Sequence, residues 1–251
     1  DRLASDFYIG IWAISPKHLF ADNLKDELWL VAGGVFGGSL YFFTENTALG
    51  ITQASNVAFI ICTAPLLTTI LSLLFYKSEK ATKGLIYGSL LALIGVGLVV
   101  FNGSVVLKLS PVGDLLTLLA ALSWAFYSLV IKRMTGRYPT VFITRKIFFY
   151  GVLTILPAFL LHPLQPDFDV LLQPLVLSNL LFLAVLASLI CYILWNVVLK
   201  QLGTMRASNY IYLNPLVTMV ASVLILHEQI TWITLMGAAC IILGVYLAEK
   251  K

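Results

Sequence analysis

A carboxylate inside an apolar run is the group in this sequence best placed to do chemistry. Glu45 lies in the apolar segment Leu28–Leu49, four residues after Tyr41. In a helix this spacing puts both side chains on one face. An ionisable group there could bind a cationic part of a solute or carry a coupling proton. The alternative is a carboxylate near the end of the segment that is simply hydrated.

Aromatic and amide side chains recur at helical spacing in other apolar runs. Trp124 with Tyr127, Tyr192 with Asn196, and Asn209 with Tyr212 would each share a helix face. Aromatic rings could line a site for a flat or apolar solute, or they could pack as ordinary core. The amides could bind solute or join helices by hydrogen bonds, the role we favour for Asn196 and its counterpart Asn46. The predicted substrate-binding set is Tyr41, Glu45, Asn56, Trp124, Tyr127, Tyr192, Asn196, Asn209 and Tyr212.

Other kinds of chemistry have little basis in the sequence. There is no GxxxxGK[ST] motif for binding nucleotide phosphates, and no convincing nucleophile–histidine–acid arrangement. Three cysteines lie in apolar runs, and three histidines lack the spacing of metal ligands. No basic stretch interleaved with aromatic residues suggests nucleic acid. We therefore expect no enzyme, metal site or cofactor, and no nucleic-acid partner.

The elements that must position these residues are membrane-spanning helices. Hydrophobic residues make up 60% of the 251 residues and charged residues only 11%, against roughly 25% charged in soluble domains. The mean hydropathy is +0.95. Because a span needs about 20 mostly apolar residues, we predict a short helix at Leu3–Ser15 and longer ones at Leu28–Leu49, Ser55–Tyr76, Gly84–Asn102, Val112–Ile131, Val141–Leu161, Leu175–Leu199, Ala207–Leu226 and Trp232–Ala248.

Basic residues predict how these helices are oriented. With the C-terminus in the cytoplasm, nearly all Lys and Arg of the connections fall on the cytoplasmic side, while the alternate connections hold Lys108 with acidic residues. We predict a multi-pass protein of the bacterial cytoplasmic membrane. Arg145 and Lys146, near a helix start, are expected to extend to the lipid headgroups; Arg145 could instead meet an anionic solute.

Two stretches of the chain repeat one pattern. Ala64-Pro65-Leu66-Leu67-Thr68 matches Asn214-Pro215-Leu216-Val217-Thr218, and each is followed by an acidic turn and a helix with two spaced glycines. The glycine pairs are Gly88 with Gly95 and Gly237 with Gly244. Proline in a span removes a backbone hydrogen bond, so Pro65 and Pro215 are predicted as a paired hinge or gate. The acidic turns fall on opposite sides of the membrane, which makes the halves, residues 1–103 and 104–251, inverted repeats.

The sequence resembles the drug/metabolite transporter superfamily, EamA type. Pro111-Val112-Gly113-Asp114-Leu115-Leu116 followed by Ala120-Ala121-Leu122-Ser123-Trp124-Ala125-Phe126-Tyr127 is similar to the opening of that family's second repeat, and His227-Glu228-Gln229-Ile230-Thr231 to its close. The resemblance implies an all-α membrane fold of two inverted five-helix repeats. This chain departs from it in lacking the first helix, so we expect nine helices here and ten in the full protein.

The resemblance and the residues together predict a secondary transporter. It would export a small organic metabolite, such as an aromatic amino acid, by alternating access. Its partners would be the solute, membrane lipid and a coupling proton. Two alternatives stay open: an antiporter of nucleotide sugars or phosphorylated solutes, which would need several cationic groups facing its cavity, and a membrane scaffold or lipid-handling protein.

Overall fold

Helices form nearly every described part of the chain. The computed structural model describes residues 20–76, 80–101, 110–161, 168–226 and 231–250. Within these ranges all regular structure is helical. The predicted helix Leu3–Ser15 and the acidic turns with Glu79 and Glu228 lie outside them. The other eight predicted helices all have counterparts in the structure, although several are interrupted.

The chain forms two compact units, each built from segments of both sequence halves. Unit 1 comprises residues 1–39 and 130–201, and unit 2 comprises residues 40–129 and 202–251. The described elements of unit 1 are α2 (Leu24–Gly34), η1 (Val35–Ser39), α8 (Thr140–Leu161), α9 (Phe168–Leu171), α10 (Pro174–Leu181), η2 (Phe182–Ile190) and α11 (Cys191–Leu202) up to Gln201. Unit 2 holds α3 (Leu40–Ile51), α4 (Ala54–Ile61), α5 (Ala64–Phe75), α6 (Lys83–Phe101), α12 (Thr204–Asn209), η3 (Tyr210–Leu213), α13 (Asn214–Leu226) and α14 (Trp232–Glu249). Helix α7 (Pro111–Thr135) contributes to both units.

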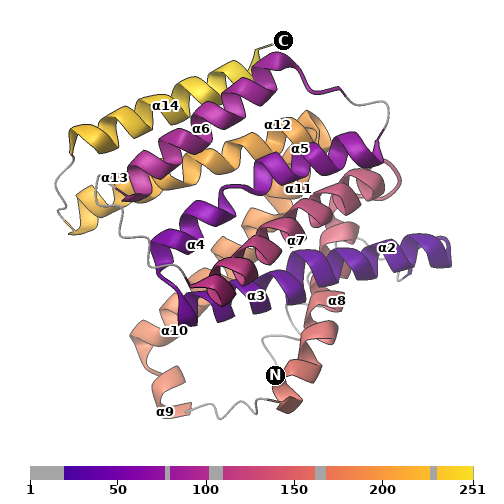
Figure 1. The fold of residues 1–251 in the computed structure, drawn as a ribbon. Helices are drawn as coiled ribbons and strands as arrows, with labels where there is room; N and C mark the ends of the chain where they lie inside the picture. The colour runs from indigo at the N-terminus through magenta and orange to yellow at the C-terminus, as the bar shows by residue number, and fades with distance from the viewer. Residues whose placement is uncertain (1–19, 77–79, 102–109, 162–167, 227–230, 251) are drawn as a thin grey trace. The chain divides into compact units, whose positions relative to one another are not determined.

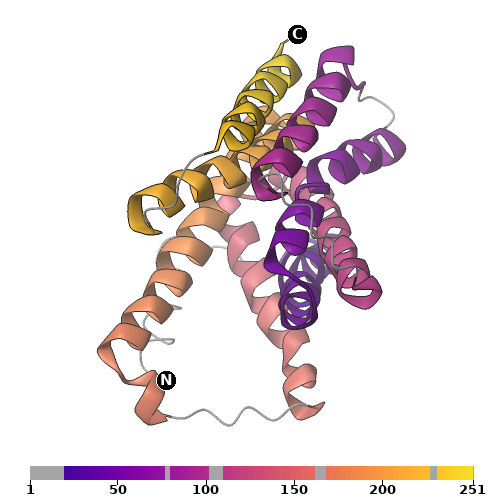
Figure 2. The same ribbon diagram turned by 60° about the vertical axis from the view of Figure 1, so that its left-hand side comes forward.

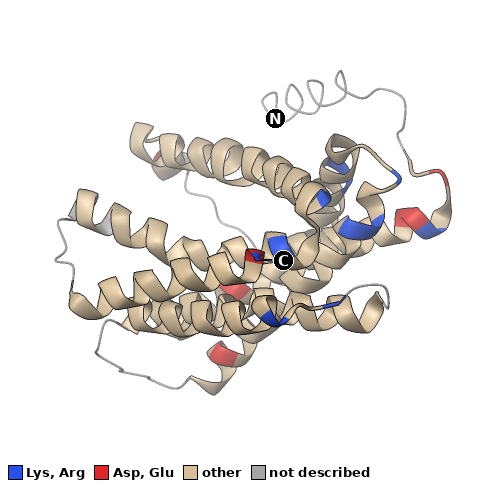
Figure 3. Cartoon of the chain, turned by 90° about the horizontal axis from the view of Figure 1, so that it is seen from above, with Lys and Arg blue, Asp and Glu red and all other residues tan. Residues whose placement is uncertain are grey.

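Six helices of the described chain are long and apolar enough to cross a membrane. They are Ala54–Phe75, Lys83–Phe101, Pro111–Thr135, Thr140–Ala158, Pro174–Leu202 and Trp232–Glu249. Long stretches of these helices carry no charged residue, as Figure 3 shows. Large apolar side chains such as Leu74, Leu183 and Leu243 are more than half exposed, the surface expected of helices that face lipid. The chain is therefore an all-α, multi-pass membrane protein.

Two predicted spans contain a stretch of π-helix instead of continuous α-helix. The first passes from α2 through η1 into α3, and the second from α10 through η2 into α11. In a π-helix the backbone bonds to the fifth residue along, which shifts the faces of the helix before and after it. Gly33, Gly34, Gly37 and Gly38 lie at the first interruption, where α2 and η1 pack against α8. A Cβ on Gly34 would lie 2.8 Å from the backbone nitrogen of Gly151, so the close approach requires glycine.

Helices α6 and α14 of unit 2 pack face to face along glycines. They lie side by side in both Figure 1 and Figure 2. A Cβ on Gly95 would lie 2.6 Å from the carbonyl oxygen of Gly237, and one on Gly244 would lie 2.5 Å from the carbonyl oxygen of Gly88. The pairing runs in opposite directions along the two helices, so they are antiparallel. Backbones this close gain dispersion contacts that larger residues would prevent.

Candidate functional site

Four of the residues predicted from the sequence form one connected group in unit 2. The hydroxyl of Tyr41 donates a hydrogen bond to Oε1 of Glu45 over 3.1 Å. The ring of Tyr41 lies 5.2 Å from that of Trp124, which lies 5.1 Å from that of Tyr127. Helix α3 supplies the first pair and α7 the second. A carboxylate therefore lies at the end of a row of three aromatic rings, the arrangement that attracts an organic cation.

The depth of this group differs from one end to the other. Tyr127 is completely buried, whereas Tyr41, Glu45 and Trp124 are only partly buried. Each pair sits three or four residues apart on its helix, so helical periodicity alone directs both members to one side. The sequence predicted those two pairs but not that they adjoin each other.

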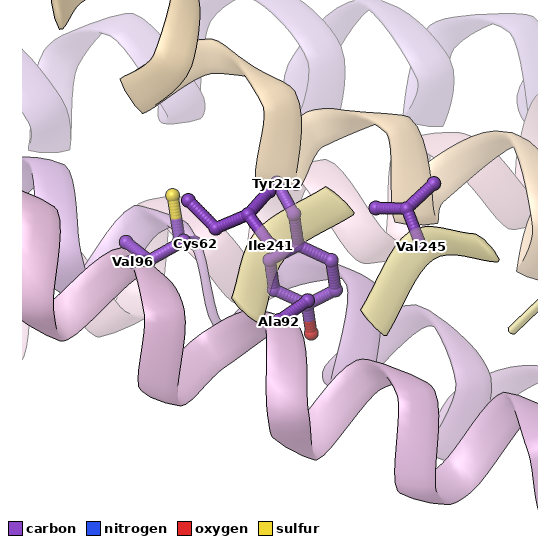
Figure 4. Close-up of a cluster of buried hydrophobic side chains, with 6 residues drawn as sticks. All are labelled: Cys62, Ala92, Val96, Tyr212, Ile241 and Val245. Carbon is purple, nitrogen blue, oxygen red and sulfur yellow. The ribbon is translucent and has the colours of Figure 1, made fainter. Parts of the chain in front are cut away.

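The other predicted residues of unit 2 lie deeper. Asn56 is buried in the first turn of α4. Asn209, at the end of α12, is fully buried, and its Oδ1 accepts a hydrogen bond of 2.9 Å from the Ser89 hydroxyl on α6. Tyr212 packs in an apolar cluster with Cys62, Ala92, Val96, Ile241 and Val245, shown in Figure 4. The ring of Tyr212 is thus part of the core of unit 2.

Tyr192 and Asn196 lie in unit 1 and bond to neighbouring helices. The Tyr192 hydroxyl donates to the carbonyl oxygen of Gly37 over 2.6 Å, within the π-helical stretch η1. Nδ2 of Asn196 donates to Oγ1 of Thr144 over 2.9 Å, and Asn196 is fully buried. Asn46 differs from its counterpart because its side chain is exposed. Through these hydrogen bonds, Tyr192 and Asn196 connect α11 to neighbouring helices.

Both predicted hinge prolines stand at helix starts after an interruption. Helix α4 ends at Ile61, a turn follows at Cys62–Thr63, and Pro65 occupies the first turn of α5. In the other half, the short 3-10 helix η3 ends at Leu213 and Pro215 is the second residue of α13. A proline is tolerated in the first turn because its missing N–H has no partner there. The prolines therefore divide each span into two shorter helices.

A group of buried hydroxyls in unit 2 was not predicted from the sequence. Oγ of Ser72 on α5 lies 3.1 Å from Oγ1 of Thr204 on α12. Thr68 lies one turn before Ser72, and Ser208 lies one turn after Thr204; all four side chains are fully buried. The sequence does place both pairs four residues apart, which is helical spacing. Serine and threonine are common in membrane helices and bond to their own backbone, so this spacing alone does not indicate a site.

In unit 1, charged residues at the start of α2 bind cations from α8 and the turn before it. Arg137 donates to Oδ1 of Asp26 over 2.9 Å and Tyr138 donates to Oδ2 over 3.1 Å. Glu27 accepts from Lys146 over 2.5 Å and also from Tyr150. The expectation that Lys146 extends to the headgroups is wrong, because its side chain is buried against Glu27 and the Phe20 ring. Arg145 lies over the ring of Phe142.

The Asp26 carboxylate should make folding sensitive to acid. Burial raises the pKa of Asp26, but hydrogen bonds from Arg137, Asn23 and Tyr138 lower it more, so the net pKa lies below its ordinary value of 3.8. A carboxyl with a lowered folded-state pKa contributes stability above its unfolded pKa and loses it as pH falls through the folded value.

We expect Asp26→Asn to lower the free energy of unfolding at pH 7 by about 2 kcal/mol, since hydrogen bonds to a charged group are lost. The difference in the free energy of unfolding between the variant and the wild type should narrow below about pH 4, where Asp26 of the wild type takes up its proton. Thermal unfolding in detergent between pH 3 and pH 7 measures this. The control is Asp169→Asn, at an exposed carboxylate of unit 1. A gap that stays constant with pH would contradict the role of the charge.

Among the described residues, no three His, Cys, Asp or Glu side chains come together as metal ligands would. Asp26 and Glu27 are instead occupied by Arg137 and Lys146.

Comparison with known proteins places this chain among membrane transporters. The model of the EamA-like transporter family matches residues 3–101 and 111–249. An uncharacterized transporter of Archaeoglobus fulgidus is 26% identical over 96% of this chain and 82% of its own length. A protein of Salmonella typhimurium named "Probable amino-acid metabolite efflux pump" is 27% identical over 92% of this chain and 80% of its own.

A solved crystal structure supports the fold independently. It superposes with a TM-score of 0.73 at 19% sequence identity, covering 88% of this chain and 75% of that one. At this identity the likeness concerns the fold alone. The family match, by contrast, covers most of the chain and both of its halves. The chain belongs to the EamA-like transporter family.

Proposed function

We propose that this transporter is a secondary exporter of small organic metabolites bearing an amino group, amino acids among them. The observation that carries the proposal is the group of Glu45, Tyr41, Trp124 and Tyr127. A carboxylate beside aromatic faces binds an ammonium group through its charge and through the rings. The name of the Salmonella relative, an amino-acid metabolite efflux pump, is consistent with that class.

The mechanism we propose is alternating access by two halves of opposite orientation, in the cytoplasmic membrane with the C-terminus inside. The antiparallel contact of α6 and α14 supports it, because Gly95 and Gly244 occupy equivalent positions of the repeat, as do Gly88 and Gly237. Gly95 lies against Gly237 and Gly88 lies against Gly244, so each glycine contacts the glycine of the other half that is not its own equivalent. A two-fold axis between inverted repeats produces this exchange. The two π-helical stretches and the two proline-divided spans also recur at equivalent positions.

Binding of phosphorylated solutes has less support. It requires cationic groups that are available to a phosphate. Lys146 is buried against Glu27, and Arg137 binds Asp26. Two of the basic side chains near helix ends of unit 1 are thus already paired.

Uptake into proteoliposomes tests the proposal. Purified protein is reconstituted, a proton gradient is imposed, and labelled amino acids, biogenic amines and sugar phosphates are offered in turn. We expect movement of an amine-bearing solute, faster with the gradient than without it. Protein-free liposomes are the control. Movement of sugar phosphates alone, or of no member of the panel, would contradict the proposal.

A further inference from the structure

The hydroxyls between α5 and α12 point to a second binding element in unit 2. Ser72 and Thr204 bond to each other over 3.1 Å. By contrast, the Thr68 and Ser208 hydroxyls and Nδ2 of Asn209 have no hydrogen-bond partner among the residues that the structure describes. All three side chains are completely buried. An unbonded polar group in a membrane interior costs free energy, so each of these groups calls for a partner that the described residues do not supply.

The helix directions bring these groups together. Helix α14 runs antiparallel to α6. In Figure 1, the span of α12 and α13 runs in the opposite direction to α5. Because the two helices are antiparallel, the residue one turn before Ser72 on α5 lies level with the residue one turn after Thr204 on α12. Thr68 and Ser208 thus face the same stretch of the interface. Asn209 follows Ser208 and is fixed to α6 by Ser89.

The chemistry of the group selects the ligand. The Asn209 carbonyl oxygen already accepts a hydrogen bond from Ser89, which leaves the amide N–H groups to donate. The two hydroxyls can donate as well. Three donor groups suit a hydrogen-bond acceptor and do not suit a metal cation, which the amide N–H groups would repel.

The residues of this group are only partly repeated at the equivalent positions of the other half. Thr68 and Ser72 correspond to Thr218 and Ser222 in the repeat, but Thr204 and Ser208 correspond to Ala54 and Ala58. Thr218 is exposed, and its hydroxyl donates to its own helix at Asn214. A contact needed only to hold two inverted halves together would be expected on both sides of the axis. Its presence on one side favours a ligand.

We infer that Thr68, Ser208 and Asn209 form a binding site for the carboxylate of the transported solute. The inference rests on the proposed function and narrows its substrate class from amines to amino acids. The carboxylate would accept hydrogen bonds from the two hydroxyls and the Asn209 amide, which replace the hydrogen bonds that it gives up in water.

Binding of matched solutes to two variants tests this site. The solutes are L-phenylalanine and L-leucine, each compared with its decarboxylated amine, phenethylamine or isoamylamine. The variants are Thr68→Val, which keeps the shape of the side chain, and Ser208→Ala. We expect each variant to bind the amino acids about tenfold more weakly, as for a lost hydrogen bond to a charged group, and the amines unchanged. Calorimetry on the purified full chain measures the dissociation constants.

The control is Thr218→Val, the same substitution at the equivalent position, which should leave both affinities unchanged. Thr68→Val should also keep or raise the melting temperature, because it removes a buried polar group. Wild-type protein that binds the amines as tightly as the amino acids, with both variants unaffected, would overturn the carboxylate site and leave the transport proposal standing. Wild-type protein that binds none of the four compounds would contradict both.

Discussion

Gly95→Ala is expected to destabilise the protein strongly, because the added methyl group has no room between α6 and α14. The new Cβ would lie 2.6 Å from the Gly237 carbonyl oxygen and 2.7 Å from the Ile241 nitrogen. Both are backbone atoms, which cannot turn aside as a side chain does. Helices α6 and α14 must therefore separate, and overpacking of this kind costs about 3 kcal/mol. We expect the melting temperature to fall by roughly 5 to 10 °C, and Gly95→Leu to prevent recovery of monodisperse protein.

Gly50→Ala is the matched control for this prediction. Gly50 lies near the end of α3 in the same unit, and a Cβ there would have no heavy atom within 4 Å. Because alanine favours a helix over glycine by up to about 1 kcal/mol, this variant should melt at the same temperature or slightly higher. Fluorescence-detected unfolding in detergent measures both variants. Equal melting temperatures for Gly95→Ala and the wild type would contradict the close packing of the two helices.

The second large effect is expected for Glu45→Gln. The change keeps the shape of the side chain and the acceptor for the Tyr41 hydroxyl, but it removes the charge. If Glu45 binds the ammonium group of the solute, losing one partner of a charge pair costs about 2 kcal/mol or more. We therefore expect kcat/KM for amine-bearing solutes to fall at least about thirtyfold, with little change in melting temperature.

The pattern of the loss distinguishes the two roles of Glu45. If it binds the solute, affinity falls with and without a proton gradient. If it carries the coupling proton, exchange of solute for solute continues while acceleration by the gradient disappears. Thr47→Val, an exposed position on the same helix, is the control. Glu45→Gln protein with wild-type transport and wild-type gradient dependence would exclude both roles.

Periodicity made much of this molecule predictable from its sequence. Eight apolar runs predicted helical segments that have counterparts in the described structure, and the pairs Tyr41–Glu45 and Trp124–Tyr127 followed from the face-sharing rule. Pro65 and Pro215 indicated where two spans are divided, because proline is tolerated in the first turn of a helix and disrupts its interior. These features depend on neighbours within one turn, which a sequence displays directly.

Features that depend on packing could not be predicted in this way. The π-helical stretch at Val35–Ser39 depends on how α2 fits against α8, and Tyr192, far along the chain, bonds to its Gly37 carbonyl. The burial of Lys146 required Glu27 to be opposite it. The unbonded hydroxyls of Thr68 and Ser208 are notable only because α5 and α12 adjoin each other. Each case is a contact between residues more than a hundred positions apart.

The most direct test of the central claim, that this chain carries an amine-bearing solute across a membrane, is counterflow in proteoliposomes. Vesicles are loaded with a high concentration of unlabelled amino acid and diluted into a trace of the labelled compound, with no proton gradient. A carrier should accumulate the label transiently above its outside concentration, and Glu45→Gln should reduce that peak. A label that only equilibrates, as through a pore, or that never enters across the whole amino-acid and amine panel, would contradict the account.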